Sequence, residues 1–239
     1  MLKIIEQLLI QFEDAEIKYC HWKSNMELAS ACHGEGDLDF LFDRKQGAQV
    51  SKILLDHGFK RAESNIDRQY PGLDDYFGYD IESGKLVHLQ AHFQLVSGQP
   101  ITKNYRFSIE QQMLNQLRLH DDTKVPIPVP TLEAAVHIFR TLIKLGWSYS
   151  ARPTSLQRHL HKASKELEFL LPNGVSDFDD NLFTATFPHI DIKLFVDLIE
   201  AMSAQMSLFV WYRYRIRICL LYTSPSPRDA TLSRMPSSA

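Results

Sequence analysis

The chain has 239 residues, of which 44% are hydrophobic and 23% are charged, and its formal net charge is −3. This composition is typical of a globular protein and excludes a disordered chain. No apolar stretch is long enough to predict a membrane span, and the near balance of basic and acidic residues argues against a nucleic-acid partner. Three cysteines without paired spacing and no secretory signal predict a cytoplasmic protein.

The first part of the chain alternates helical and strand patterns. Apolar residues at helical spacing predict amphipathic helices over residues 1–16 and 44–57. Runs rich in strand-forming residues predict short strands at residues 17–22, 37–42 and 59–64.

A hairpin is predicted next, with strands over residues 76–81 and 86–96 that are joined by a Ser-Gly turn. Successive side chains of a strand point to opposite faces, so the second strand has two different faces. One face is apolar and contains Val87, Leu89, Ala91 and Phe93. The other face is polar without a formal charge and contains His88, Gln90 and His92.

Residues 124–130 contain three prolines in alternation, which predicts a linker that does not lie inside a sheet. This linker separates an α/β domain of residues 1–125 from a helical region of residues 126–218. The helical region is expected to form helices over residues 131–145, 154–171 and 190–217. The predicted fold is therefore mixed α/β (α+β), with a mixed sheet and flanking helices followed by an α-helical region.

Residues 219–239 differ in character from the rest of the chain, because they are rich in Ser and Pro and have no apolar periodicity. They resemble a translated sequencing-library adapter, and we expect them to be non-native; the alternative is a natural Ser/Pro-rich tail. Because they interrupt a helical pattern, we expect the native C-terminus to be missing. The missing segment would cover aromatic side chains of the last helix, including Phe209 and Trp211.

Two acids, Asp37 and Asp39, open the strand predicted at residues 37–42. Strand alternation places both carboxylates on the same face, where their repulsion favours a cation between them. Hard divalent cations such as Mg²⁺ bind such oxygen ligands together with substrate phosphates. Gly34 and Gly36 let the backbone just before the strand approach an anionic ligand. A solvated strand start is the alternative interpretation of the two acids.

The order of these elements resembles the nucleotidyltransferase fold of the DNA-polymerase-β superfamily. That order is a helix, a strand that ends in Lys23-Ser24, a short helix, a Gly-x-Gly turn and an Asp-x-Asp strand. Within the superfamily, residues 5–95 look like the uncharacterised bacterial nucleotidyltransferases. The most specific part of this resemblance is Lys23-Ser24 followed by Gly36-Asp37-Leu38-Asp39.

The resemblance implies that Asp37 and Asp39 are catalytic and hold Mg²⁺ (or Mn²⁺) ions, which bridge the phosphates of an NTP. Lys23, Ser24 and Gly36 would bind the nucleotide. The reaction would move a nucleoside monophosphate from the NTP to a hydroxyl group of a small molecule or protein. No feature of the sequence identifies that acceptor.

The sequence departs from the family pattern at two points. Lys23 replaces a glycine that normally lets a phosphate lie against the backbone. The superfamily's third carboxylate normally lies on a later strand, where this chain has the possible cleft residues His88, Gln90 and His92.

The two histidines are predicted to face the acids, where imidazole would suit Mn²⁺ better than Mg²⁺ or act as a general base. The nearby acids Asp75, Asp80 and Glu82 are candidates for the missing third carboxylate. Without one, the alternative function is a catalytically degenerate module that binds a nucleotide or sugar phosphate.

Overall fold

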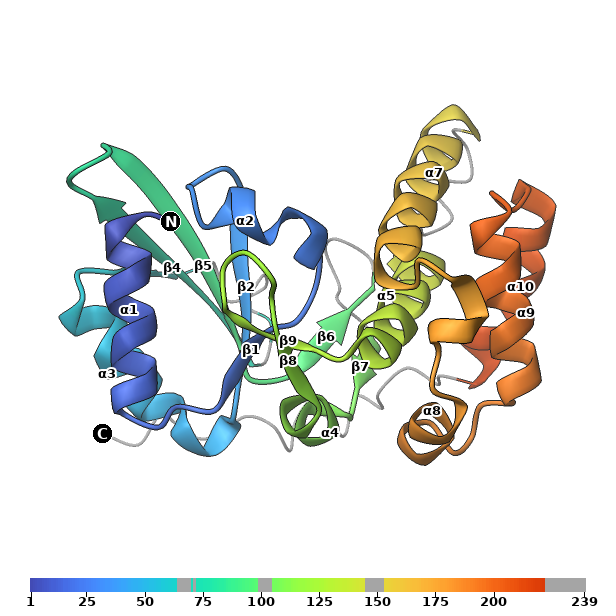
Figure 1. Ribbon diagram of the computed structural model, residues 1–239, viewed down its shortest axis with the longest axis horizontal. Coiled ribbons are helices and arrows are strands. Elements are labelled where there is room, and N and C mark those ends of the chain that lie inside the picture. The colour runs from blue at the N-terminus through green and yellow to red at the C-terminus, as the bar shows by residue number, and fades with distance from the viewer. Residues whose placement is uncertain (64–69, 71, 99–104, 145–152, 222–239) are drawn as a thin grey trace. The chain divides into compact units, whose positions relative to one another are not determined.

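The computed structural model describes the chain in two compact units (Figure 1). Unit 1 contains Met1–Leu95 and Ser108–Val129, and unit 2 contains Val96–Phe107 and Pro130–Ala239. The residues outside the described part are 64–69, 71, 99–104, 145–152 and 222–239. The predicted Ser/Pro-rich tail therefore lies almost entirely outside the described residues.

Unit 1 is built on a five-stranded mixed sheet with the strand order β1-β2-β5-β4-β3. Strands β2 and β5 pair in parallel, and the other neighbouring strands pair antiparallel. A mixed α/β fold with a mixed sheet is therefore confirmed. The strands are β1 (Tyr19–His21), β2 (Asp37–Phe42), β3 (Lys60–Ala62), β4 (Leu73–Asp80) and β5 (Lys85–His92).

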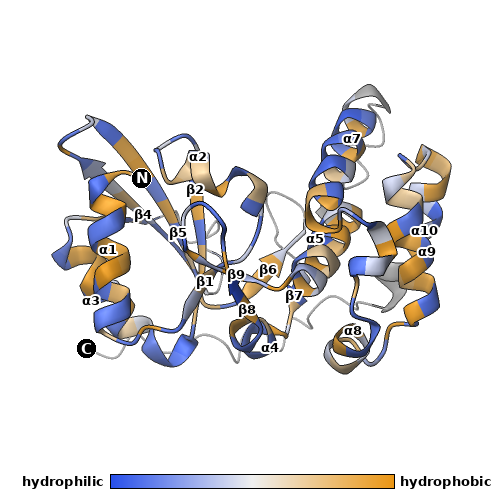
Figure 2. Ribbon diagram, viewed as in Figure 1, coloured by the Kyte–Doolittle hydropathy of each residue, from blue (hydrophilic) through white to orange (hydrophobic). Residues whose placement is uncertain are grey.

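Helices α1 (Lys3–Asp14) and α3 (Gly47–Asp56) pack on one face of this sheet, as their apolar spacing predicts. Both helices have an apolar and a polar side (Figure 2). Their buried side chains form one core with the apolar side chains of β2 and β5. This core includes Ile5, Leu8, Phe12, Leu38, Phe40, Val50, Leu54, Val87, Leu89 and Ala91. We call the opposite face of the sheet the polar face.

Short helical segments connect these elements in unit 1. They are η1 (Asn25–Glu27), α2 (Leu28–Ala31), η2 (Arg44–Gln46) and α4 (Glu110–Asn115). Cys20 and Cys32 are both buried free thiols, and burial raises the pKa of Cys32 to about 11. Neither cysteine is therefore poised as a nucleophile.

The predicted proline-spaced linker is wrong in one respect, because β9 (Pro126–Pro128) pairs antiparallel with β8 (Leu117–Leu119). The backbone N–H of His120 donates to the carbonyl of Val125 over 2.9 Å. Ladder hydrogen bonds fall on alternate residues of an antiparallel pair, so the next bonded position of β9 is Ile127. Both prolines then occupy positions that need no ladder N–H, which is why this short strand tolerates them.

Unit 2 contains five described helices and a small strand pair. The helices are α5 (Pro130–Lys144), α7 (Pro153–Leu170), α8 (Asp180–Thr186), α9 (Ile192–Ser203) and α10 (Leu208–Leu221), with a short η4 (Gly174–Asp177). Strand β6 (Leu95–Ser97) pairs with β7 (Tyr105–Phe107). No helix in the described part of the chain is long and apolar enough to cross a membrane.

The single helix predicted over residues 190–217 is two helices, α9 and α10. The chain turns between them at Gln205, whose φ of 54° is left-handed and cannot continue a right-handed helix. In α10, Trp211 is buried whereas Phe209 is 78% exposed. Phe209 is therefore exposed on this helix as expected, whereas Trp211 is covered by other residues.

Strand β5 allows a matched test of the two-faced sheet. Leu89 is fully buried in the core, whereas Leu86 on the same strand is 59% exposed. We expect Leu89→Ala to reduce the free energy of unfolding by about 2–5 kcal/mol, because it leaves a cavity between the sheet and its helices. Leu86→Ala should change it by less than about 0.5 kcal/mol. Urea denaturation of both variants measures the difference, and equal losses would contradict this assignment of faces.

Candidate functional site

Asp37 and Asp39 lie on the polar face of β2, as strand alternation predicts. Leu38 lies between the two acids in the sequence, and Phe40 follows Asp39. Both point to the opposite face and are fully buried in the core. The side chain of Asp37 is 55% exposed, and that of Asp39 is only 11% exposed. The two carboxylates therefore share a face but differ strongly in their access to solvent.

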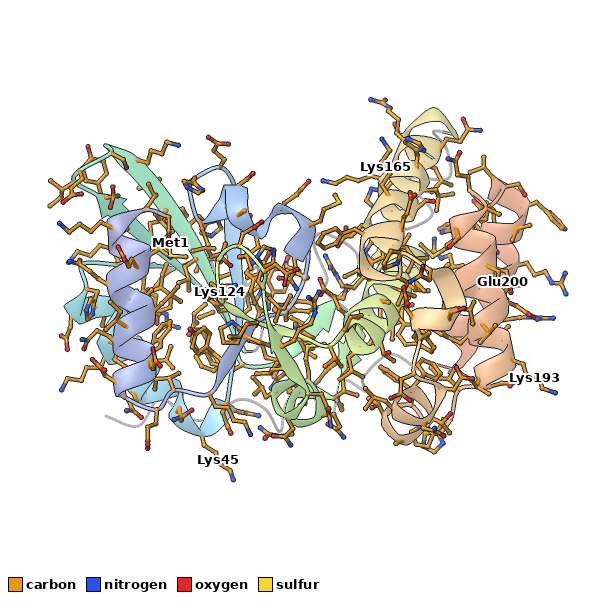
Figure 3. The ribbon with its side chains drawn as sticks, in the orientation of Figure 1. Met1, Lys45, Lys124, Lys165, Lys193 and Glu200 are labelled. Atoms are coloured by element: carbon orange, nitrogen blue, oxygen red, sulfur yellow. The ribbon has the colours of Figure 1, made fainter. Side chains whose placement is uncertain are left out.

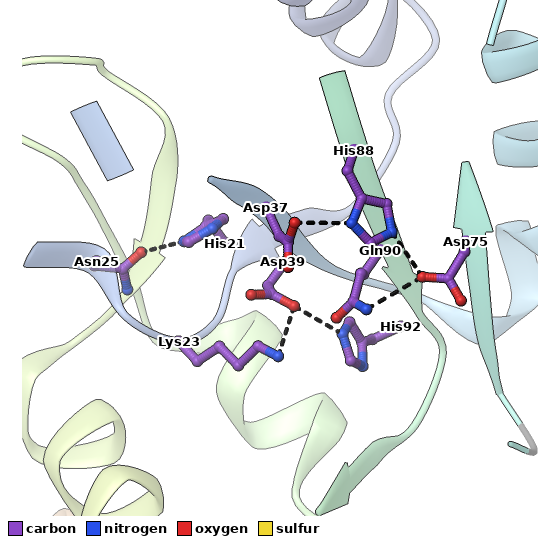
Figure 4. Close-up of polar contacts among 9 residues, drawn as sticks. All are labelled: His21, Lys23, Asn25, Asp37, Asp39, Asp75, His88, Gln90 and His92. Carbon is purple, nitrogen blue, oxygen red and sulfur yellow. Dashed lines mark hydrogen bonds and ion pairs between the residues drawn. The ribbon is translucent and has the colours of Figure 1, made fainter. Parts of the chain in front are cut away.

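The polar side chains of β5 face these acids: His92 contacts Asp39, the residue toward which both histidines were expected to point, and His88 contacts Asp37 instead. In the β2–β5 register, His88 lies opposite Asp37 and Gln90 lies opposite Asp39. His88 Nδ1 donates a hydrogen bond to Asp37 Oδ1 over 2.8 Å, and His92 Nε2 donates to Asp39 Oδ1 over 3.2 Å (Figure 4). The parallel pairing of β2 with β5 thus brings acids and imidazoles into contact.

Asp75 joins this face from the next strand, β4, where it pairs in register with Gln90. Its Oδ1 accepts hydrogen bonds from His88 Nε2 over 2.8 Å and from Gln90 Nε2 over 3.1 Å. The sequence named Asp75 as one of three candidates, but the strand predicted there began one residue too late to place it. β4 begins at Leu73, and the alternation of β4 puts Asp75 on the polar face.

The other two candidate acids lie elsewhere and are bonded in the hairpin region. Asp80 accepts from the backbone N–H of Ile4 over 3.0 Å and from Ser83 Oγ over 2.6 Å. Glu82 pairs with Lys3 on α1 over 2.5 Å. Only Asp75 of the three candidates is therefore in hydrogen-bond contact with the polar side chains of β5 in the described structure.

His88 lies between two carboxylates, and both contacts favour its protonated form. Carboxylate oxygens only accept hydrogen bonds, so the two ring nitrogens of His88 donate to Asp37 and to Asp75. The hydrogen bond to Asp75 is the main cause of a raised His88 pKa; burial opposes it, and the contact with Asp37 adds to it. The ring also stacks on Phe77, with centroids 4.5 Å apart. The arrangement therefore stabilises the imidazolium form of His88 relative to the neutral form.

Lys23 and Asp39 form a largely buried ion pair. The Nζ atom of Lys23 lies 2.6 Å from Asp39 Oδ1, and the two side chains are 14% and 11% exposed. Burial alone would raise the pKa of Asp39, but the Lys23 charge and the hydrogen bond from His92 outweigh it and hold this pKa well below its usual range. The indole of Trp22 packs edge-on against His92, with centroids 5.1 Å apart.

The segment that carries Lys23 has an unusual backbone conformation. Ser24 is left-handed, with φ 57° and ψ 37°, a conformation that favours glycine. The segment is tied to β2 where the N–H of Trp22 donates to the carbonyl of Asp39, and it is closed where His21 Nδ1 donates to Asn25 Oδ1 over 2.5 Å. No pattern in the sequence predicts this buried His21–Asn25 contact.

Gly36 lies directly before β2, and its φ of 147° is a value that L side chains rarely adopt. A Cβ atom there would meet Ala31 only at an ordinary 3.8 Å. The backbone conformation, and not a lack of space, therefore requires glycine at the start of the Asp37–Phe42 strand.

The donor set offers a metal ion only part of its coordination shell. In the described part of the chain, no group of three or more His, Cys, Asp and Glu side chains is arranged to hold a metal. The contacts described for Asp37 and Asp39 all use Oδ1, which leaves Oδ2 of each as a hard oxygen donor. Mg²⁺ is commonly held by one or two carboxylates plus substrate phosphates, so these residues fit a cation that arrives with an anionic ligand.

No protein-family model, curated protein or solved structure matches this chain. What the polar face does is therefore inferred from its chemistry.

The contact between Asp75 and His88 has a measurable consequence. We expect the His88 pKa to lie above the usual histidine value, because both carboxylates stabilise the imidazolium. Asp75→Asn should lower it, whereas Asp74→Asn, at the neighbouring position of β4 where Asp74 pairs with Arg61, should leave it unchanged. A group with a raised pKa stabilises the fold at low pH, and this contribution is lost as pH rises through the folded-state pKa.

An NMR titration of the histidine ring signals measures this shift, with the His88 signal assigned by its loss in His88→Gln. An unchanged midpoint in Asp75→Asn would contradict the role given to Asp75.

Proposed function

We propose that the polar face of unit 1 is the site of a metal-dependent nucleotidyltransferase, which moves a nucleoside monophosphate from an NTP to a hydroxyl acceptor. The observation that carries the proposal is the pair Asp37 and Asp39 on one strand face, beside the Lys23 ammonium. Carboxylates for a cation and an ammonium for a phosphate are the groups that phosphoryl transfer requires. The motif resemblance of residues 5–95 supports the same reaction.

Each residue of the site has a role in this proposal. Asp37 and Asp39 would hold Mg²⁺ (or Mn²⁺). When bound, this cation would neutralise part of the negative charge of the phosphates. Lys23 would contact the phosphates as a point charge, and the left-handed Ser24 turn would present its hydroxyl and backbone to them. Asp75, which accepts a hydrogen bond from Gln90, would hold His88 in place.

The two carboxylate contacts of His88 change the role that the sequence suggested for it. Both ring nitrogens are engaged with Asp37 and Asp75, and the raised pKa favours the protonated form, so His88 suits a general base poorly in this arrangement. It suits a fixed positive charge near phosphate oxygens, to which it can also donate a hydrogen bond. The described residues place no chemical restriction on which hydroxyl compound is the acceptor.

A binding module without turnover is the second candidate function. The observations that favour it are that Lys23 already neutralises Asp39 and that the third carboxylate, Asp75, is bonded to His88. Such a module would bind a nucleotide or sugar phosphate through Lys23 and His88 and leave it unchanged.

Label transfer distinguishes the two candidates. The chain is incubated with each α-³²P-labelled NTP, with Mg²⁺ or Mn²⁺ and with a mixture of hydroxyl acceptors, and label in protein and small molecules is measured. We expect transfer by the wild type and a loss of about 100-fold or more in Asp37→Asn/Asp39→Asn, because the carboxylates supply transition-state stabilisation.

Asp74→Asn is the matched control, because Asp74 is a β4 carboxylate that pairs with Arg61 and lies on the opposite strand face from Asp75. It should transfer label at the wild-type rate. Equal transfer by the wild type and the double variant would contradict the enzyme, and nucleotide binding without any transfer would support the binding module.

A further inference from the structure

The Lys23–Asp39 ion pair places a cation where the proposed metal would have to bind. The two atoms are 2.6 Å apart, and neither side chain is more than 14% exposed. Asp37 and Asp75 both accept hydrogen bonds from the His88 ring that lies between them. The three acids of the polar face are thus compensated by groups of the protein itself (Figure 4).

A divalent cation and the Lys23 ammonium repel each other if both lie against the same carboxylate. Moving Lys23 away from Asp39 gives up a short, largely buried ion pair, so another anion must replace Asp39 if the cost is to be small. Solvent is a poor substitute at a side chain that is 14% exposed.

A phosphate group meets this requirement. It offers the ammonium strong anionic acceptors, and the flexible four-carbon stem of a lysine lets the ammonium move between neighbouring acceptors. Once Lys23 is paired with phosphate, Asp39 is open to the cation, which the same phosphate helps to coordinate.

We propose that Lys23 is the resident cation of Asp39, and that a divalent cation binds Asp39 tightly only together with a phosphate ligand that takes over Lys23. This inference rests on the proposed function, because it takes Asp37 and Asp39 as the metal-binding residues. Its consequence is that the site does not fill with metal before nucleotide arrives. The ligand itself completes the switch from an ammonium to a metal ion at Asp39.

The first test uses the metal alone. Mn²⁺ is titrated into the full chain without any phosphate, and free Mn²⁺ is followed by electron paramagnetic resonance. Lys23→Met should bind Mn²⁺ about tenfold or more tightly than the wild type, because the competing ammonium is gone. Adding Asp39→Asn to Lys23→Met should remove this gain.

Lys45→Met is the matched control for the loss of one positive charge. The Lys45 side chain points away from the protein body (Figure 3). The Mn²⁺ affinity of Lys45→Met should equal that of the wild type. Equal Mn²⁺ affinity in Lys23→Met and the wild type would overturn the inference.

The second test uses the wild type and does not depend on whether Lys23→Met folds. Acetic anhydride labelling, read by mass spectrometry, reports how accessible each lysine amine is. Without phosphate, Mn²⁺ should bind Asp39 only weakly, so that a large excess of Mn²⁺ is needed to displace Lys23 and raise its labelling several-fold. Pyrophosphate added with Mn²⁺ should protect Lys23 again, and Lys45 should not respond. Unchanged Lys23 labelling across these conditions would overturn the inference.

The two proposals fail in different ways. Label transfer from NTP together with equal Mn²⁺ binding by both chains would overturn the Lys23 exchange alone. The predicted Mn²⁺ and labelling results without any label transfer would overturn the enzyme and leave the exchange at a binding site.

Discussion

The register between the parallel strands β2 and β5 is the constraint on which the rest of unit 1 depends. It sets Asp37 opposite His88 and Asp39 opposite Gln90, and it sets Leu38 opposite Leu89 on the other face. A slip of one residue would turn every side chain of one strand to the wrong face, so that carboxylates would enter the core. The packing of α1 and α3 against the apolar face therefore also fixes the geometry of the polar face.

Charge compensation is the second constraint, and it acts within the polar face. Asp39 is too buried to be solvated well, and its anionic form is stabilised by Lys23 and His92. Asp37 is exposed and could be solvated by water, yet it shares His88 with Asp75. The result is an arrangement in which a bound anion or cation must exchange partners with groups that are already paired.

The proposed function requires this arrangement to supply only part of a metal centre. Two of its acids come from one strand, and the contacts described for them use Oδ1 of each carboxylate. The remaining coordination would come from outside the protein, which is common for Mg²⁺ at phosphate-transfer sites. A dedicated cage of protein ligands is therefore not what this chemistry requires.

Local periodicity determined much of unit 1 from the sequence alone. The spacing of apolar residues indicated the faces of α1 and α3. Alternation put Asp37 and Asp39 together on one face of β2 and the two histidines together on one face of β5. These features are local, because they depend only on the repeat of a helix or strand. The two prolines of β9 show the limit, since their tolerance depends on the pairing register with β8.

Only the tertiary structure decided which groups meet. His88 and Asp37 are 51 residues apart in the chain, and His92 and Asp39 are 53 apart. The choice of Asp75 over Asp80 and Glu82 follows from strand pairing and not from any local pattern. The partner of Lys23 and the protonation state of His88 depend on these long-range contacts, because charge and hydrogen bonding act through space and not along the sequence.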